Sequence, residues 1–60
     1  MSFVGIEINN SKVAKISGNT IAPASKDSIG IRINNSDDTI VNKDNVIIAG
    51  KTIVINDKEQ

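Results

Sequence analysis

Few residues of this 60-residue chain have the type and spacing that catalysis or metal binding requires. Asp37, Asp38 and Asp44 are close carboxylates, and paired carboxylates can drive glycoside hydrolysis or bind calcium. Asp37 and Asp38 follow Ser36, however, where turn formation accounts for them. The chain has no histidine or cysteine to activate a hydroxyl nucleophile or to bind zinc. We therefore expect no enzyme activity, no catalytic, cofactor-binding or metal-binding residues, and no cofactor.

The elements that would position any side chain are indicated by an internal repeat. The segment GIEINNS at 5–11 returns as GIRINNS at 30–36, and more weakly as TIVIND at 52–57. The starts of the three segments are 25 and then 22 residues apart. Self-similarity at such a period marks a repeat architecture, in which each unit buries its apolar side against its neighbours.

The aliphatic composition favours strands. There are twelve isoleucines, five valines and eight asparagines, but no leucine. β-branched residues pack well on pleated surfaces, and asparagine tolerates turns and the left-handed backbone region. The prediction is an all-β fold, a short parallel β-solenoid of about two and a half coils. It forms a single module over 1–60, with coil 1 at about 4–29, coil 2 at about 30–51 and a partial coil 3 at about 52–57.

Alternation of apolar and polar residues predicts the strands and their inward faces. In coil 1 the expected strands cover 4–8, 13–17 and 20–22, with Ile16 inward and either Val13 or Ala14 beside it. The loop 22–28, which contains Pro23, closes this coil. In coil 2 the expected strands cover 31–33, 39–42 and 46–48, and a tighter closure at 49–51 follows. Ile53 and Ile55 begin the third coil, and 57–60 form a polar end.

The register of the middle strand has two solutions, because coil 2 contains one extra residue. Ile21 is ten positions after Ser11, and Ile47 is eleven positions after Ser36. If the turns align at Asn19 and Asn45, Asn42 stacks on Ile16. If Ile40 stacks on Ile16, the insertion falls in the turn. We favour the second solution, because an inward asparagine needs a partner to offset its desolvation.

The alternative fold is an antiparallel meander. It is disfavoured because no Asn-Gly, Asp-Gly or Gly-Gly dipeptide marks a tight hairpin. It also gives no reason for the heptapeptide to recur, whereas in a solenoid equivalent residues stack about 4.8 Å apart.

Two sets of outward side chains are candidates for binding. Glu7 and Arg32 occupy equivalent positions and would form either one wall of a saccharide groove or a solvated ion pair contributing under about 1 kcal/mol. Val54 continues their column as an exposed apolar residue, which contact with another chain would explain. A ladder at the corner would bind a ligand or satisfy the turn's own polar groups; it comprises Asn9, Asn34 and Asn56, with Asn10, Asn35 and Asp57 beside them. For both sets we favour the structural interpretation.

The repeated GIxINNS phrase, and ISGNTI at 16–21 with its echo KDNVI at 43–47, resemble the right-handed parallel β-helix family. This is the fold shared by pectate lyases and many bacteriophage tailspikes, and the resemblance covers roughly 4–56. It implies a structural or adhesive module of a trimeric tailspike or similar surface appendage, giving a rigid stalk or contact with host polysaccharide. The alternative is a non-catalytic fragment of a β-helical polysaccharide lyase or hydrolase. The aspartates and basic residue that a lyase would need are not recognisable.

Composition also restricts the partners. Zero net charge and a single aromatic, Phe3, argue against nucleic acid or an anionic membrane. The longest apolar run, 46–49, is too short to span a bilayer, and no signal peptide is recognisable in this chain. The expected location is a virion tail or an extracellular surface. So small a solenoid, with open strand edges, predicts a homo-oligomer, with a trimer favoured. Val54, Val41 and Ile48 are the outward aliphatics expected to contact the other chains.

Overall fold

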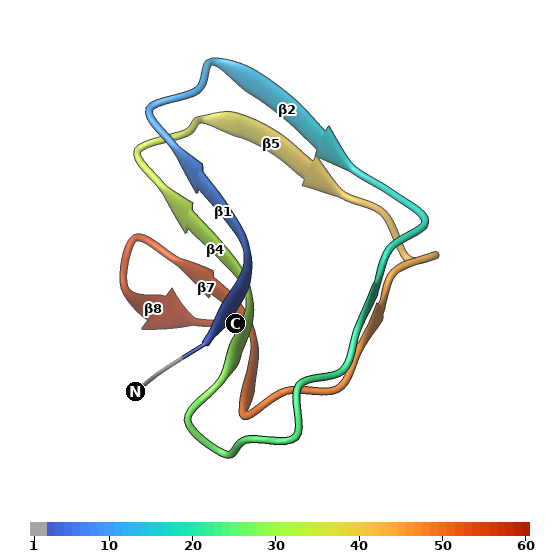
Figure 1. Cartoon of the computed structure of the whole chain (residues 1–60). Coiled ribbons are helices and arrows are strands. Elements are labelled where there is room, and N and C mark those ends of the chain that lie inside the picture. Colours follow the sequence, from blue (N-terminus) through green and yellow to red (C-terminus); the bar gives the residue numbers. More distant parts are fainter. Residues whose placement is uncertain (1–2) are drawn as a thin grey trace.

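The computed structural model describes residues 3–60, and within them the chain is all-β with no helix (Figure 1). Eight short strands follow one another along the chain. They are β1 (Val4–Asn9), β2 (Val13–Ile16), β3 (Thr20–Ile21), β4 (Ile29–Asn34), β5 (Asp38–Val41), β6 (Val46–Ile47), β7 (Lys51–Ile55) and β8 (Lys58–Glu59). The all-β prediction is confirmed.

The strands form three sheets that the chain visits in turn. The first sheet has the order β1-β4-β7-β8, the second pairs β2 with β5, and the third pairs β3 with β6. A first pass therefore runs through β1, β2 and β3, a second through β4, β5 and β6, and a third enters the first sheet again as β7 (Figure 1). All pairs between passes are parallel. The antiparallel meander is therefore wrong for β1 to β7.

Isoleucines from successive passes are register partners in the first sheet. Ile6 pairs with Ile31, which pairs with Ile53. Ile8, Ile33 and Ile55 form the next column. Ile31 is fully buried, since it has a neighbour on either side, whereas the isoleucines of the outer passes are half-buried. The predicted stacking of these columns is confirmed.

The core lies between the first sheet and the other two. Its buried members are Ile16, Ile21, Ile31 and Ile33. Complete burial of an isoleucine side chain contributes about 2 kcal/mol, so the first and second passes, with two of these residues each, both contribute to the hydrophobic stabilisation. Partly buried aliphatics surround this cluster, namely Ile6, Ile8, Val41, Ile47, Ile53 and Ile55.

The register of the second sheet differs from both solutions considered from the sequence. Ile16 pairs with Val41, and Lys15 pairs with Ile40. Val41 packs against the core, and Ile40 is 55% exposed. Neither Ile40 nor Asn42 stacks on Ile16, although the Asn42 N–H donates to the Ile16 carbonyl at 2.9 Å.

The physical reason is where the extra residue enters. The offset between the first two passes is 25 residues in the first and second sheets, as between Ile16 and Val41. It becomes 26 in the third sheet, where Thr20 pairs with Val46. The insertion therefore falls in the turn 42–45, as the favoured solution required, but β5 keeps the register set by the preceding corner. Within β2, Ala14 lies half-buried beside Ile16, and Val13 is exposed.

The chain ends in a hairpin that the sequence did not predict. Asn56 and Asp57 have φ values of 48° and 64°, and β8 then pairs antiparallel with β7. Two successive residues in the left-handed region make the turn type that joins tightly paired strands. The Gln60 N–H donates to the Ile53 carbonyl at 2.9 Å. Asn-Asp replaces the usual Asn-Gly, which is why the polar end was not expected to form a strand.

This hairpin overturns the prediction for Val54. Val54 is only 5% exposed, and it lies between its register partners Arg32 and Glu59. Val41 also faces the core, so two of the three aliphatics predicted to face other chains are covered. Ile48 alone of the three is exposed, at 64%.

Glycine in the repeated phrase permits close packing between the first and third sheets. A Cβ on Gly5 would lie 2.7 Å from Cγ2 of Ile21. A Cβ on Gly30 would collide with Cγ2 of Ile47. Each glycine therefore lets the isoleucine of its own pass rest against the backbone of the first sheet. The third occurrence of the phrase has Thr52 here, where the chain forms no further strand of the third sheet.

Candidate functional site

The outer face of the first sheet carries the charged residues singled out from the sequence. Glu7 and Arg32 are register partners, as predicted. Among residues 3–60, however, Arg32 forms its ion pair with Asp57, with 3.3 Å between Nη2 and Oδ1. The Glu7 carboxylate accepts a hydrogen bond from Asn9 Nδ2 at 3.0 Å instead. Because Asp57 is largely exposed, the Arg32–Asp57 pair contributes under about 1 kcal/mol.

The corner asparagines form the expected contacts between the first two passes. The side-chain amides of Asn9 and Asn34 are hydrogen-bonded at 2.9 Å. Asn35 Nδ2 donates to Asn10 Oδ1 at 2.8 Å, and both of these residues have positive φ. Stacked amides thus satisfy one another where the backbone turns sharply. Within the chain, these hydrogen bonds stabilise the corner.

The third rung of this ladder departs from the first two. Asn56 Oδ1 accepts from the Asn35 backbone N–H at 2.8 Å, so the column continues. Asn56 is itself in the left-handed region, however, whereas its counterpart Asn34 lies in a strand. The chain consequently turns one residue earlier, and Asp57 reaches Arg32.

A second asparagine ladder lies at the turn between the second and third sheets. Asn45 Oδ1 accepts from both the backbone N–H and the side-chain Nδ2 of Asn19, at 3.0 and 3.1 Å. Asn45 Nδ2 donates to the carbonyls of Ile16 and Asn42, at 2.9 and 2.7 Å. The side chain of Asn45 therefore joins two passes and closes its own turn. One signal of it is visible in the sequence, namely the alignment of the turns at Asn19 and Asn45.

The three candidate carboxylates, Asp37, Asp38 and Asp44, lie in or beside turns. Asp37 and Asp38 are exposed at the start of β5. Asp44 accepts from the Ser17 hydroxyl at 3.0 Å. Hydrogen bonding from the Gly18 backbone and then from Ser17 lowers the pKa of Asp44. These contacts hold a turn against the pass beside it and assemble no acid–base pair.

Ser28 is a buried polar residue that the sequence did not indicate. Its hydroxyl donates to the Ser25 carbonyl and accepts from the Gly50 N–H at 3.0 Å. Its carbonyl accepts from the Lys51 N–H at 2.9 Å. Ser28 therefore fastens the long return loop of the first pass to the short return of the second.

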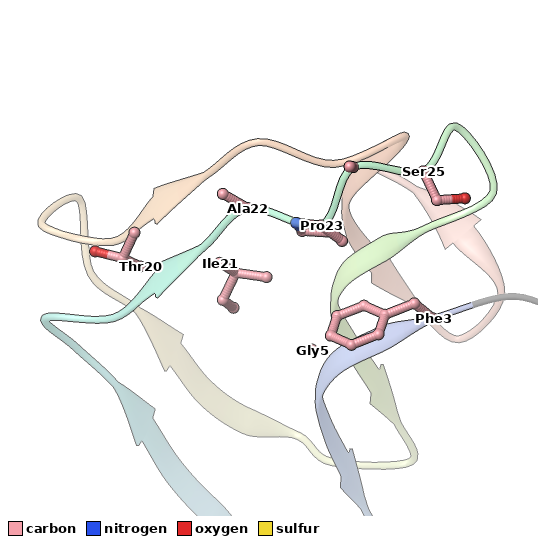
Figure 2. A pocket seen from close by; sticks show the side chains of 8 residues that line it. Phe3, Gly5, Thr20, Ile21, Ala22, Pro23 and Ser25 are labelled. Carbon is pink, nitrogen blue, oxygen red and sulfur yellow. The ribbon is translucent and has the colours of Figure 1, made fainter.

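A hollow lies at the end of the molecule formed by the first pass. It has a volume of about 750 Å³, and Figure 2 shows Phe3, Ile21 and Pro23 lining it. The remaining lining residues are Gly5, Thr20, Ala22, Ala24 and Ser25. All of them belong to the first pass, and its strands lie at the edges of their sheets. The hollow is thus the uncovered end of the apolar core.

Exposed aliphatics gather on the outer faces of the second and third sheets. Val13 and Ile40 project from β2 and β5, and Val46 and Ile48 lie in and after β6. Each has more than half of its surface exposed. A smaller hollow of about 300 Å³ adjoins Ile48 and is lined by the two return loops. These faces therefore offer apolar surface to a partner, which the first sheet does not.

The part of the chain that the structure describes holds no group of three His, Cys, Asp or Glu residues able to bind a metal ion. Nor do residues 3–60 include a helix of the length and hydrophobicity needed to cross a bilayer. No known protein family, curated protein or solved structure matches this chain.

Proposed function

We propose that the three passes are coils of a short parallel β-solenoid, and that its hand is right-handed. The support is the order in which the sheets are visited and the isoleucine columns that repeat from pass to pass. Parallel connections between strands of one sheet are right-handed in nearly all proteins, which favours the same hand as the resemblance.

On this fold, we propose a structural and adhesive function: a module of a phage tailspike or a similar extracellular surface appendage. Stacked coils share hydrogen bonds along the stacking direction, so they resist bending and can act as a rigid stalk. The observation that carries this proposal is the common register of Ile6, Ile31 and Ile53 across three passes. A repeated backbone with inward aliphatics is suited to extension.

The proposed assembly is a homotrimer joined through the outer faces of the second and third sheets. Val13, Ile40, Val46 and Ile48 are the aliphatics available for such contact. Their burial between chains would add about 1 to 2 kcal/mol each to a module whose own core is small. This choice replaces Val54 and Val41, which are covered within one chain.

The proposed contact surface for host polysaccharide is the outer face of the first sheet. Its Glu7, Arg32 and corner asparagines offer charged and amide groups in register between neighbouring strands. Such groups donate to and accept from sugar hydroxyls, and their regular spacing suits a repeating polymer.

Light scattering after size-exclusion chromatography tests the assembly. A trimer has three times the 6.4 kDa mass of the chain, and Ile48→Lys should reduce it to smaller species. Gln60→Lys is the matched control, since it adds the same charge at an exposed position of the hairpin. A wild-type chain that stays monomeric at millimolar concentration, with a native circular dichroism spectrum, would contradict the trimer.

A second measurement tests the adhesive role against the enzymatic alternative. Affinity electrophoresis in gels containing capsular polysaccharides should show retardation that Arg32→Ala reduces. Incubation with acidic polysaccharides should leave the ultraviolet absorbance of unsaturated products unchanged. A rise in that absorbance would favour a polysaccharide lyase.

A further inference from the structure

We propose that the end of the molecule formed by the first pass, here called the open end, binds the open end of a second copy of this chain about a two-fold axis. The open end consists of the outer edges of β1, β2 and β3 and the 750 Å³ hollow between them. This pairing is separate from the lateral contacts proposed above and does not depend on how many chains those contacts join.

The outer edge of β1 carries backbone groups directed away from its neighbour. The Ile29 N–H donates to the Phe3 carbonyl at 2.7 Å. In a parallel ladder, alternate residues of one strand bond to the same neighbour, so Phe3, Gly5 and Glu7 serve β4. The N–H and C=O groups of Val4, Ile6 and Ile8 therefore point out of the open end. Such an edge is a template for another strand.

The hollow adds an apolar surface beside this edge. Phe3 is 49% exposed and lines it together with Ile21 and Pro23 (Figure 2). A partner that only hydrogen-bonded to β1 would leave this end of the core in water. A partner with the same outline covers both the strand edges and the apolar centre.

The opposite end of a second copy does not fit this role. There the first sheet extends through β7 to β8, which runs antiparallel, and the second and third sheets end at β5 and β6. That stepped surface cannot match three strand edges at one level. Two open ends do match each other. A two-fold axis places each strand edge of one copy beside a strand edge of the second copy that runs in the opposite direction. The contact closes on itself and gives a pair instead of a fibre.

The size of the open end sets the expected affinity. Four strands stacked at about 4.8 Å span about 14 Å, so the 16 Å extent of the molecule is its stacking direction. The other extents, 31 and 23 Å, bound the open end. A face within these limits is at or below the roughly 800 Å² per partner of a standard interface. Association is therefore expected at micromolar concentrations or above.

Val4→Pro tests the proposal, with Val4→Ala as its matched control. Both substitutions remove the valine side chain, but only proline removes the N–H that points out of the open end. Proline is tolerated at the first residue of an edge strand, so the fold should persist. By sedimentation equilibrium, the mass of wild type and Val4→Ala at high concentration should be twice that of Val4→Pro. Equal masses for all three natively folded chains would overturn the proposal, whether the lateral assembly is a trimer or a single chain.

Chemical synthesis supplies a second variant if Val4→Pro fails to fold. N-methylation of Ile6 blocks an outward N–H and keeps every side chain, and it should halve the mass in the same way. Nitroxide labels at Lys12→Cys in the first pass and Lys58→Cys in β8 then distinguish the two ends. Distances between copies, measured by electron spin resonance, should be shorter for position 12. Shorter distances at position 58 would show that the other ends meet and would overturn the proposal.

Discussion

Asn45 accepts two hydrogen bonds from Asn19, one from its backbone N–H at 3.0 Å and one from its side-chain amide at 3.1 Å. The two residues are 26 positions apart, one more than the register partners Ile16 and Val41 in the sheet that precedes them. This contact therefore marks the place where the second pass has absorbed its extra residue. The Asn45 side chain makes four hydrogen bonds, all of which truncation to alanine would remove.

Asn45→Ala should lower the free energy of unfolding by about 2 kcal/mol, because the Asn19 N–H and the Ile16 carbonyl both lose a part-buried partner. Urea denaturation followed by circular dichroism measures the change. Asn42→Ala is the matched control in the same turn, and it should cost less than about 0.5 kcal/mol. Equal costs for the two variants would contradict the role assigned to Asn45.

Gly30→Ala should cost at least about 2 kcal/mol, since overpacking a rigid core is destabilising. Its Cβ would collide with Ile47 and lie 2.7 Å from the Thr52 carbonyl oxygen. The corresponding residue of the third pass gives the comparison, because Thr52→Ala changes an exposed position and should alter stability little. Thermal midpoints of both variants check this. A Gly30→Ala protein as stable as wild type would mean that the first and third sheets are not in close contact.

Thr39→Val should raise the free energy of unfolding by about 0.5 to 1 kcal/mol. Thr39 Oγ1 is buried and makes no hydrogen bond, and replacing an unsatisfied hydroxyl with a methyl group removes a desolvation cost. Thr39→Ser, which keeps the hydroxyl and removes the methyl group, should instead destabilise. The urea midpoints of wild type, Thr39→Val and Thr39→Ser test whether the Thr39 hydroxyl is unsatisfied. That assignment is wrong if Thr39→Ser is the most stable of the three.

Asp44→Asn should reduce stability at neutral pH but not in acid. The pKa of Asp44 is lowered from its ordinary value of 3.8 by hydrogen bonds from the Gly18 backbone and Ser17. A carboxyl with a depressed pKa in the folded state stabilises the fold above its unfolded pKa and loses that contribution as pH falls through the folded value. The difference in melting temperature between wild type and variant should therefore be largest near pH 7 and shrink below about pH 4. A difference independent of pH would contradict this.

The sequence was sufficient for the parts of the fold that repeat. The columns of Ile6, Ile31 and Ile53 were predicted, because identical spacing and β-branched side chains leave few other arrangements. The corner amides of Asn9 and Asn34 followed from the same spacing.

The unpredicted parts depend on interactions that occur only once. Val41 is the partner of Ile16 because the extra residue of the second pass lies in the turn that follows β5. Hydrogen bonds of the Asn45 side chain hold that turn, and the pattern of hydrophobic residues in the sequence does not reveal them. The burial of Val54 depends on a hairpin at Asn56 and Asp57 that lacks the usual glycine. Local polar contacts thus determine the register of β5 and the burial of Val54, which the repeat in the sequence does not specify.

The two returns from the third sheet to the first differ in length without disturbing the strands they precede. Seven residues join β3 to β4, and three join β6 to β7, yet β4 and β7 remain paired in register. Loop closure costs little more for a few extra residues. The length of the longer return can consequently vary while the paired strands keep their alignment, provided that the hydrogen bond between Ser28 and the Ser25 carbonyl is kept.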